Sequence, residues 1–184
     1  SMKLLFLKEQ TDADARINQA LTEIYTQFES DINDLAQYEL SRSEANPDYL
    51  QDTLRGFSDE KTDFLVSVFC SYMDDDIVSF ACFFTYFPHG LHPVAGCVYY
   101  VFDRHAGKQL TFEDFEGDSS HILDVISPYL DRAVEWEISP ENILDPRRFS
   151  LSDDGYTLFF TDTTSRIYDW FTVTIPYDAF DKEP

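Results

Sequence analysis

Residues 83–114, FFTYFPHGLHPVAGCVYYVFDRHAGKQLTFED, are the most informative part of this chain. An apolar, aromatic run leads into the loop HGLHP (residues 89–93), and a second apolar run follows at Gly96–Asp103. A polar turn then spans Arg104–Lys108, with Gly107 suited to the left-handed residue that tight hairpins need. Periodicity therefore predicts two antiparallel strands, with one loop between them and a tight turn after the second.

Further strands are predicted on both sides of this stretch. Thr62–Tyr72 and Ile77–Phe87 are rich in Val and Phe and are joined by three aspartates at 74–76, which predicts an antiparallel hairpin with a solvated turn. The turn signal Ser152–Gly155 separates two more apolar runs. The other predicted strands are Lys3–Lys8, Arg148–Leu151, Tyr156–Thr161 and Trp170–Pro176.

Two helices complete the expected fold. An apolar stripe at three- and four-residue steps, from Ile17 to Leu35, predicts an amphipathic helix over Ala13–Tyr38, and the motif at 11–14 is a capping box. Asp118 can cap a second helix that Pro128 should end or kink. The fold class predicted is α+β: an antiparallel sheet packed against the N-terminal amphipathic helix and the second helix.

Composition narrows the possible partners. The 184 residues are 43% hydrophobic and 16% aromatic, enough for a packed core. The 35 acidic residues outnumber the 13 basic ones, which gives a net charge of −22. Such a surface repels nucleic acid and anionic bilayers and attracts a cationic partner. The alternative is that the acidity only keeps the protein soluble.

The cysteines and the N-terminus give little further information. Cys70 and Cys82 lie in apolar runs and are expected to be small core residues, and Cys97 makes the count odd. No apolar run reaches the length of a membrane span. Met2–Leu7, a lysine followed by apolar residues, is like the start of an export signal, but Lys8–Gln10 ends the apolar stretch early. The expected location is extracytoplasmic, in the periplasm or at the cell surface, if an export signal was removed, and cytoplasmic otherwise.

Between Ile17 and Phe180, four sequence features occur in an order that resembles one known family. They are Ile17-Asn18 in the first helix; the strand pair Phe64–Phe84 with Ile77-Val78-Ser79; HGLHP with Asp103, Gly107-Lys108 and Leu110-Thr111; and Phe149–Leu151 with Asp154-Gly155 and Val173–Tyr177. The chain resembles the C-terminal domain shared by RsiV-type anti-sigma factors and PdaC-type peptidoglycan deacetylases. It departs from that pattern at His89, at Leu91, and at Thr163–Asp169, which lacks the family's Pro and Gly.

The resemblance implies a function. The RsiV-type domain is a receptor for lysozyme, and the PdaC-type domain accompanies a catalytic domain without being the catalyst. The chain is therefore expected to be a non-enzymatic binding domain of the bacterial cell envelope that recognises or inhibits a cationic, lysozyme-like hydrolase. The alternatives are an immunity protein against a bacterial toxin, a peptidoglycan-binding module and, least favoured, a hydrolase. Residues 1–60 are expected to form a strand–helix lobe and residues 61–184 the family-like domain, together one compact unit.

Candidate binding residues lie in the loop and among the aromatics. His89, Gly90 and His92 could contact a partner, although a structural role for this loop is the favoured alternative. Surplus aromatic side chains could anchor an interface or stack on sugars, with ordinary sheet packing as the alternative for each. The aromatic residues proposed for binding are Tyr86, Tyr99 and Trp170.

Catalysis and metal binding find less support in the sequence. Pairing His89 and His92 with a carboxylate would be an unconvincing metal site, and no cofactor is expected. The chain has no G-x-S-x-G nucleophile elbow. Glu113 and Asp114 could imitate a glycosidase pair, but acidic pairs arise by chance among 35 acids.

Overall fold

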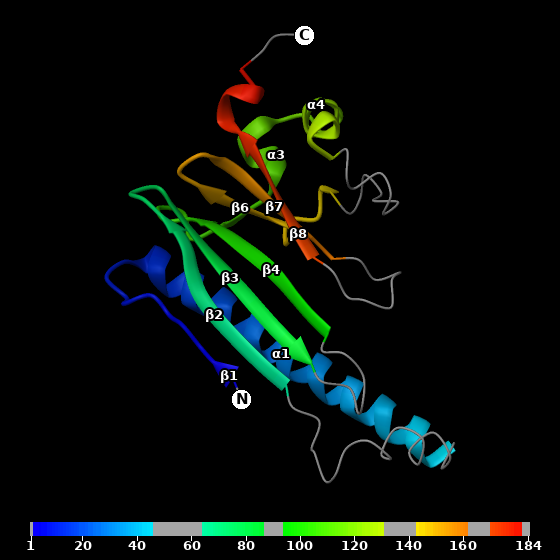
Figure 1. The fold of residues 1–184 in the computed structure, drawn as a ribbon. Coiled ribbons are helices and arrows are strands. Elements are labelled where there is room, and N and C mark those ends of the chain that lie inside the picture. The colour runs from blue at the N-terminus through cyan, green and yellow to red at the C-terminus, as the bar shows by residue number, and fades with distance from the viewer. Residues whose placement is uncertain (1, 46–63, 87–93, 131–142, 162–169, 182–184) are drawn as a thin grey trace.

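The computed structural model describes residues 2–45, 64–86, 94–130, 143–161 and 170–181 (Figure 1). Within these ranges the strands form two sheets. Their order is β1-β2-β3-β4-β5 in the first and β6-β7-β8 in the second. The α+β class is confirmed, but the strands expected to share one antiparallel sheet are divided between two.

The first sheet and its helix come from the N-terminal part of the described chain. Its pairs are antiparallel except that β1 runs parallel to β2. The elements are β1 Met2–Lys3, α1 Asp12–Ala45, β2 Phe64–Met73, β3 Ile77–Tyr86, β4 Val94–Asp103 and β5 Gln109–Leu110.

Short helices and the second sheet follow. The second sheet is wholly antiparallel. The elements are α3 Phe112–Glu116, α4 Ser119–Ile126, the 3-10 turn η1 Ser127–Leu130, β6 Phe149–Ser152, β7 Gly155–Thr161, β8 Trp170–Pro176 and the 3-10 turn η3 Tyr177–Ala179.

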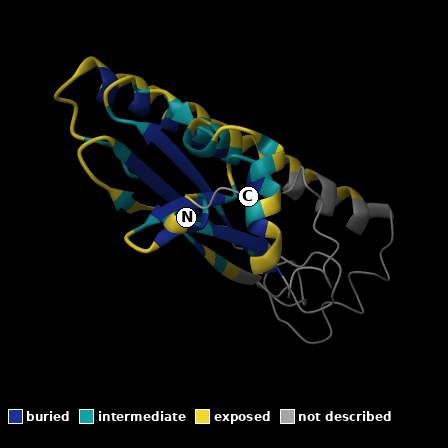
Figure 2. Ribbon diagram, turned by 90° about the horizontal axis from the view of Figure 1, so that it is seen from above, coloured by how far each residue is buried: buried dark blue, intermediate teal, exposed yellow. Residues whose placement is uncertain are grey.

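Helix α1 covers one face of the first sheet. Its buried side chains Ile17, Leu21 and Tyr25 pack on alternate residues of β3 and β4, including Phe80 and Phe102. Figure 2 shows this contact as dark blue strands beneath the helix, whose outer side is exposed. The apolar stripe predicted from the sequence is therefore the face that the helix buries.

The second sheet packs on the opposite face. Ala81, Cys97 and Tyr99 of the first sheet meet Phe159 of β7 there, and a larger core joins the second sheet to α3 and α4. The backbone at Arg147 and Arg148 ties the two sheets together. The carbonyl of Arg147 accepts from the amide of Tyr99 at 2.7 Å, and that of Arg148 accepts from the amide of Phe159 at 2.9 Å. The side chains between the two sheets therefore form one layer that both sheets share.

Several predicted elements are confirmed. The 62–72 and 77–87 hairpin is present as β2 and β3, the second helix begins after Asp118, and β8 has the expected bounds. The amide of Asp14 donates to Thr11 Oγ1 at 3.1 Å and the amide of Thr11 donates to Asp14 Oδ2 at 2.9 Å, which is the predicted capping box. Gly107 adopts φ 64° as expected.

Other predictions were wrong. The strand expected at Lys3–Lys8 ends at Lys3, because the following backbone is bonded to side chains of α1 instead of to β2. Helix α1 continues to Ala45, beyond the predicted end at Tyr38. Cys70 is exposed, while Cys82 and Cys97 are buried. The predicted boundary between 1–60 and 61–184 lies outside the described residues.

Candidate functional site

Five aspartates from two turns gather at one end of the molecule. Asp74, Asp75 and Asp76 form the turn between β2 and β3, and Asp153 and Asp154 form the turn between β6 and β7. Figure 1 shows both turns side by side at the upper left, although they belong to different sheets. We call this group of five aspartates the acidic end.

The first turn owes its shape to one carboxylate. Asp74 Oδ1 accepts from the amides of Asp76 at 2.8 Å and Ile77 at 2.7 Å, and the amide of Asp74 donates to the carbonyl of Ile77 at 3.0 Å. An aspartate that bonds the backbone two and three residues ahead stabilises a tight turn. This side chain is therefore structural, and its two neighbours are left on the surface.

Two tyrosines lie between the turns. The Tyr72 hydroxyl donates to Asp74 Oδ2 at 2.8 Å, and the Tyr177 hydroxyl donates to the carbonyl of Ser152 at 2.8 Å. Both rings pack against the core of the second sheet. Each tyrosine therefore anchors one of the two turns by its hydroxyl and the core by its ring.

The pKa values follow this arrangement. The hydrogen bond to Asp74 and partial burial raise the pKa of Tyr72 to about 12, and the charge of Asp153 acts in the same direction. Burial raises the pKa of Tyr177, and the charges of Asp74 and Asp153 raise it further. Although burial opposes it, hydrogen bonds from Ile77 and Tyr72 hold the pKa of Asp74 below its ordinary value. At neutral pH Asp74 is therefore ionised, while the phenols of Tyr72 and Tyr177 are neutral.

Two side chains from the turn after β4 contact the first aspartate turn. Arg104 donates to the carbonyl of Asp74 through its guanidinium, and His105 Nε2 lies 2.8 Å from Asp76 Oδ1. Within the described ranges, no hydrogen bond or salt bridge reaches the exposed carboxylates of Asp75, Asp153 or Asp154. These three carboxylates are available to an incoming cation.

Most of the binding residues predicted from the sequence are not described by the structure. His89, Gly90 and His92 lie outside the described residues. Tyr86 and Trp170 have described backbones, at the ends of β3 and β8, but their side chains are outside the description. The structure therefore leaves these five residues as predictions.

Tyr99 is described and is only 8% exposed, with its ring against Phe159 at 6.5 Å. Ordinary sheet packing, the alternative given for this residue, therefore accounts for Tyr99. Tyr100 and Tyr156 are buried in the same way. Neither Tyr72 nor Tyr177 was predicted from the sequence as a site residue. Tyr72 lies just before Asp74, a signal that could have indicated it, whereas Tyr177 is far from both turns in sequence and reaches Ser152 only in the fold.

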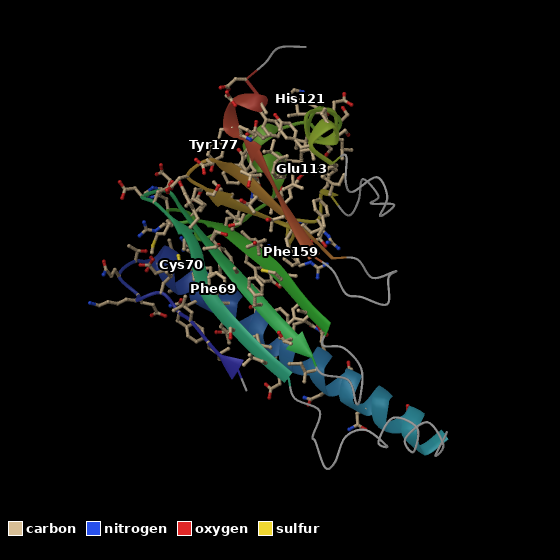
Figure 3. All side chains as sticks on the ribbon, viewed as in Figure 1. Phe69, Cys70, Glu113, His121, Phe159 and Tyr177 are labelled. Atoms are coloured by element: carbon tan, nitrogen blue, oxygen red, sulfur yellow. The ribbon has the colours of Figure 1, made fainter. Side chains whose placement is uncertain are left out.

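Other groups with possible chemistry have structural duties. Glu113 accepts from the Ser119 hydroxyl at 3.0 Å, and Asp114 is bonded to Lys108 at 2.8 Å and to the amide of Thr111 at 2.8 Å. Figure 3 shows Glu113 beside the short helices and away from the acidic end. These carboxylates are therefore engaged at helix starts. Among the described residues, no three His, Cys, Asp or Glu side chains gather as metal ligands would.

The cysteines are unpaired in the structure. Burial raises the pKa of Cys82 and of Cys97 to about 12, and burial also raises that of Cys70, whose thiol donates to the carbonyl of Tyr72 at 3.3 Å. Because the thiolate is the nucleophilic form, all three remain weak nucleophiles at neutral pH.

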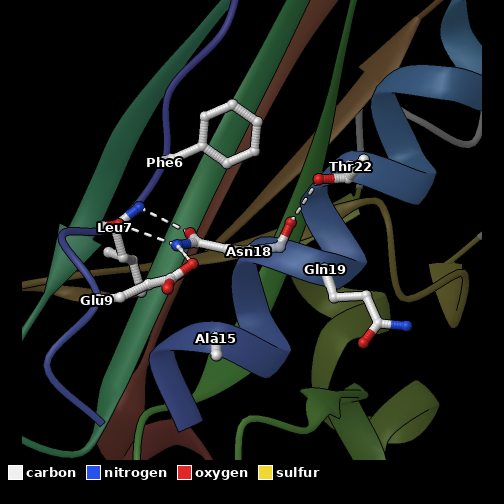
Figure 4. A pocket seen from close by; sticks show the side chains of 7 residues that line it. All are labelled: Phe6, Leu7, Glu9, Ala15, Asn18, Gln19 and Thr22. Atoms are coloured by element: carbon white, nitrogen blue, oxygen red, sulfur yellow. Dashed lines mark hydrogen bonds between the residues drawn. The ribbon is translucent and has the colours of Figure 1, made fainter. Parts of the chain in front are cut away.

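A shallow groove of about 530 Å³ lies between the segment before α1 and the helix itself (Figure 4). Asn18 crosses its floor. Its side chain accepts from the amide of Leu7 at 2.8 Å and donates to the carbonyl of Leu7 at 2.9 Å and to Glu9 at 3.1 Å. The polar atoms of Asn18 are thus used to hold the N-terminal segment.

Comparison with solved structures identifies the fold. A DUF3298 family protein from Bacteroides fragilis superimposes with a TM-score of 0.53 at 14% identity, covering 89% of this chain and 68% of that one. The fold resembles that of a DUF3298 protein. This is the family of RsiV- and PdaC-type C-terminal domains. A DUF3298 protein from Pseudomonas aeruginosa gives a TM-score of 0.49 at 15% identity over 71% of this chain, which spans 66% of that protein's length.

No family model matches the sequence, and no curated protein matches it. At 14% identity the likeness concerns the fold alone, so the function has to be argued from the site. No helix in the described part of the chain has both the length and the apolar character needed to cross a bilayer.

Proposed function

We propose that this chain is a non-enzymatic binding domain of the bacterial cell envelope that captures a cationic, lysozyme-like cell-wall hydrolase. The observation that carries the proposal is the acidic end, where two turns from different sheets present exposed carboxylates around Tyr72 and Tyr177. The net charge of the chain, −22, has the same sign. Charge of this kind steers a basic protein toward the surface and orients it.

The two tyrosines supply what charge alone lacks. Tyrosine is enriched among the residues that dominate binding energies, because a large rigid ring buries area at little entropic cost. Tyr72 and Tyr177 are half-buried and fixed by their hydroxyl bonds, so little of their freedom remains to be lost on binding. The acidic end therefore combines steering charges with ordered aromatic anchors.

A direct test is titration of a purified basic muramidase into the chain, with inhibition of its activity on cell walls measured in parallel. We expect binding at low ionic strength that weakens strongly on raising the salt, because the exposed carboxylates act through screened charges. Sedimentation with purified peptidoglycan, indifferent to salt, would instead favour a wall-polymer module. Turnover of the wall substrate by the chain alone would contradict a non-enzymatic role.

A further inference from the structure

Exposed apolar side chains of the described residues are concentrated around β2. Among these residues, six large hydrophobic side chains are exposed. Three of them lie in β2, and two lie in the segment that follows β1. They are Leu65, Phe69 and Met73 in β2, Leu4 and Phe6 before α1, and Tyr129 elsewhere. The ring of Phe6 meets Tyr25 of α1 with centroids 5.4 Å apart, so the apolar row that remains beside the edge is the one on β2. Exposed apolar area of this kind is typical of an interaction surface.

Among the described residues, the outer edge of β2 is paired only at two positions near its start. Strand β1 pairs with it only at Met2↔Val66 and Lys3↔Ser67. The chain then turns to α1, where Tyr25 donates to the carbonyl of Leu5 at 2.7 Å and Asn18 holds Leu7. From Val68 onward, no described residue bonds to the outer backbone edge of β2.

This edge lacks most of the usual guards against strand addition. The sequence of β2, FLVSVFCSYM, contains no charged residue, proline or glycine. A bulge between Cys70 and Tyr72 interrupts its pairing only near the turn. Natural edge strands generally carry such guards, so a bare edge of this kind is suited to pairing with another chain.

A row of aromatic rings supports the same strand. Leu65 and Phe69, four residues apart, point to the face away from α1. The ring of Phe69 stacks on Phe83 with centroids 5.7 Å apart, and Phe83 meets Phe159 of β7 at 6.3 Å. Figure 3 labels Phe69 and Phe159, the two ends of this row. Phe69 is 45% exposed, so the outer end of this row is accessible while its inner end is fixed in the core.

We propose that an extended segment of a cationic protein adds to the outer edge of β2 as a further strand. Its apolar side chains would lie on Leu65 and Phe69, and its basic side chains would reach the aspartates at 74–76, where β2 ends. Main-chain bonds give affinity in this mode of binding and alternate side chains give specificity. Charge argues against a second copy of this chain, because pairing two molecules of net charge −22 brings like charges together.

This inference rests on the proposed function for the charge of the partner, but its test is separate. The probe is a short synthetic peptide of alternating valine and lysine. One control peptide carries N-methyl groups on alternate amides, and another has glutamate in place of lysine. Amide hydrogen exchange of the chain is measured by mass spectrometry and NMR in the presence of each peptide. The same measurement is made on the chain without peptide at several protein concentrations.

We expect the valine–lysine peptide to slow exchange at alternate amides from Val68 to Ser71, and the two control peptides to leave them unchanged. Phe69→Ser should weaken binding by about tenfold, and Tyr129→Ser, at a similarly exposed site away from β2, by less than about twofold. The N-methylated peptide tests the edge without altering the fold.

Absence of peptide binding, or binding without slower exchange in β2, would overturn the strand-addition proposal. Slower exchange that appears with rising protein concentration alone would overturn it too, in favour of self-pairing. If a basic muramidase binds without protecting β2, the edge proposal fails and the capture proposal stands. If the peptide protects β2 but no muramidase binds, the reverse holds.

Discussion

At the residue scale, Gly155 shows how one position fixes the second aspartate turn. Its φ is 152°, and a Cβ there would lie 2.1 Å from the carbonyl oxygen of Ile175 on β8. Ser152 closes the same turn by donating from its hydroxyl to the carbonyl of Gly155 at 2.9 Å. The turn that presents Asp153 and Asp154 therefore depends on glycine for both its conformation and its close approach to β8.

We predict that Gly155→Ala lowers the free energy of unfolding by about 2–4 kcal/mol, from backbone strain plus the clash with β8. Gly117→Ala is the matched control. Gly117 also has a positive φ, 80°, but a Cβ there meets nothing within 4 Å. Gly117→Ala should therefore lower the free energy of unfolding by only about 1 kcal/mol. Urea unfolding measures both. Equal losses would mean that the approach to β8 is not what requires glycine.

At the scale of elements, α3 ties the short helices to the second sheet. Phe112 is 2% exposed, and its ring lies 5.0 Å from Phe149, 4.6 Å from Tyr156 and 5.8 Å from Phe180. Tyr156 also donates its buried hydroxyl to Glu116 at the end of the same helix. This helix of five residues is thus held by its aromatic contacts more than by its own backbone bonds.

Phe112→Ala is expected to cost about 3–5 kcal/mol of unfolding free energy, because it leaves a cavity among the rings of Phe149, Tyr156 and Phe180. Phe112→Leu keeps most of the volume and should cost less than about 1.5 kcal/mol. Thermal and urea unfolding followed by circular dichroism give both values. If Phe112→Ala lowers the free energy of unfolding by less than about 1 kcal/mol, the side chains around this site are not tightly packed.

The sequence indicated some elements and not others for identifiable reasons. Helix α1 and the β2–β3 hairpin were predictable, since their apolar periods are long and their caps and turns are local. Helix α3 was missed although Thr111 and Asp114 repeat the spacing of Thr11 and Asp14, because five residues are too few to show a period. The division into two sheets was not predictable, since it depends on Arg147 and Arg148 joining strands distant in sequence.

The candidate site was less predictable than the fold. The aspartates of the first turn were recognised only as a solvated turn, and nothing local reveals that the second turn lies beside it. Tyr99 was proposed as a binding residue because its burial cannot be seen locally. The ring that covers it, Phe159, lies 60 residues later in the sequence. Sequence patterns give the face of a strand but not which part of that face a second sheet will cover.

At the scale of the whole molecule, acid is expected to act through specific aspartates. Hydrogen bonds and neighbouring cations lower the pKa of six of them below the ordinary 3.8, so these groups stabilise the folded state above that pH and lose their contribution as pH falls below it. They are Asp14, Asp74, Asp103, Asp114, Asp118 and Asp145. General charge repulsion has the opposite trend, because it is smallest near the pI of about 4.2.

Stability should therefore fall as the pH drops below 3.8, even though self-repulsion has been relieved on the way down. In Asp103→Asn the acid-induced loss should be shallower. The backbone amides of Ala106 and His105 are the main causes of the lowered pKa of Asp103, and an amide side chain can still accept from both but does not titrate. Urea unfolding from neutral pH to about pH 3 compares the two proteins. Parallel curves would exclude Asp103 from the acid response.

If the acidic end is the surface that captures a basic protein, removing its charges should weaken binding more than removing the same charge elsewhere. Asp75→Asn, Asp153→Asn and Asp154→Asn together remove its unpaired carboxylates, while Glu23→Gln, Glu29→Gln and Asp34→Asn remove the same charge from exposed positions on α1. Isothermal titration with a basic muramidase at low salt should show about tenfold weaker binding for the first set and less than about twofold for the second. Equal weakening of both sets, or none, would contradict the account.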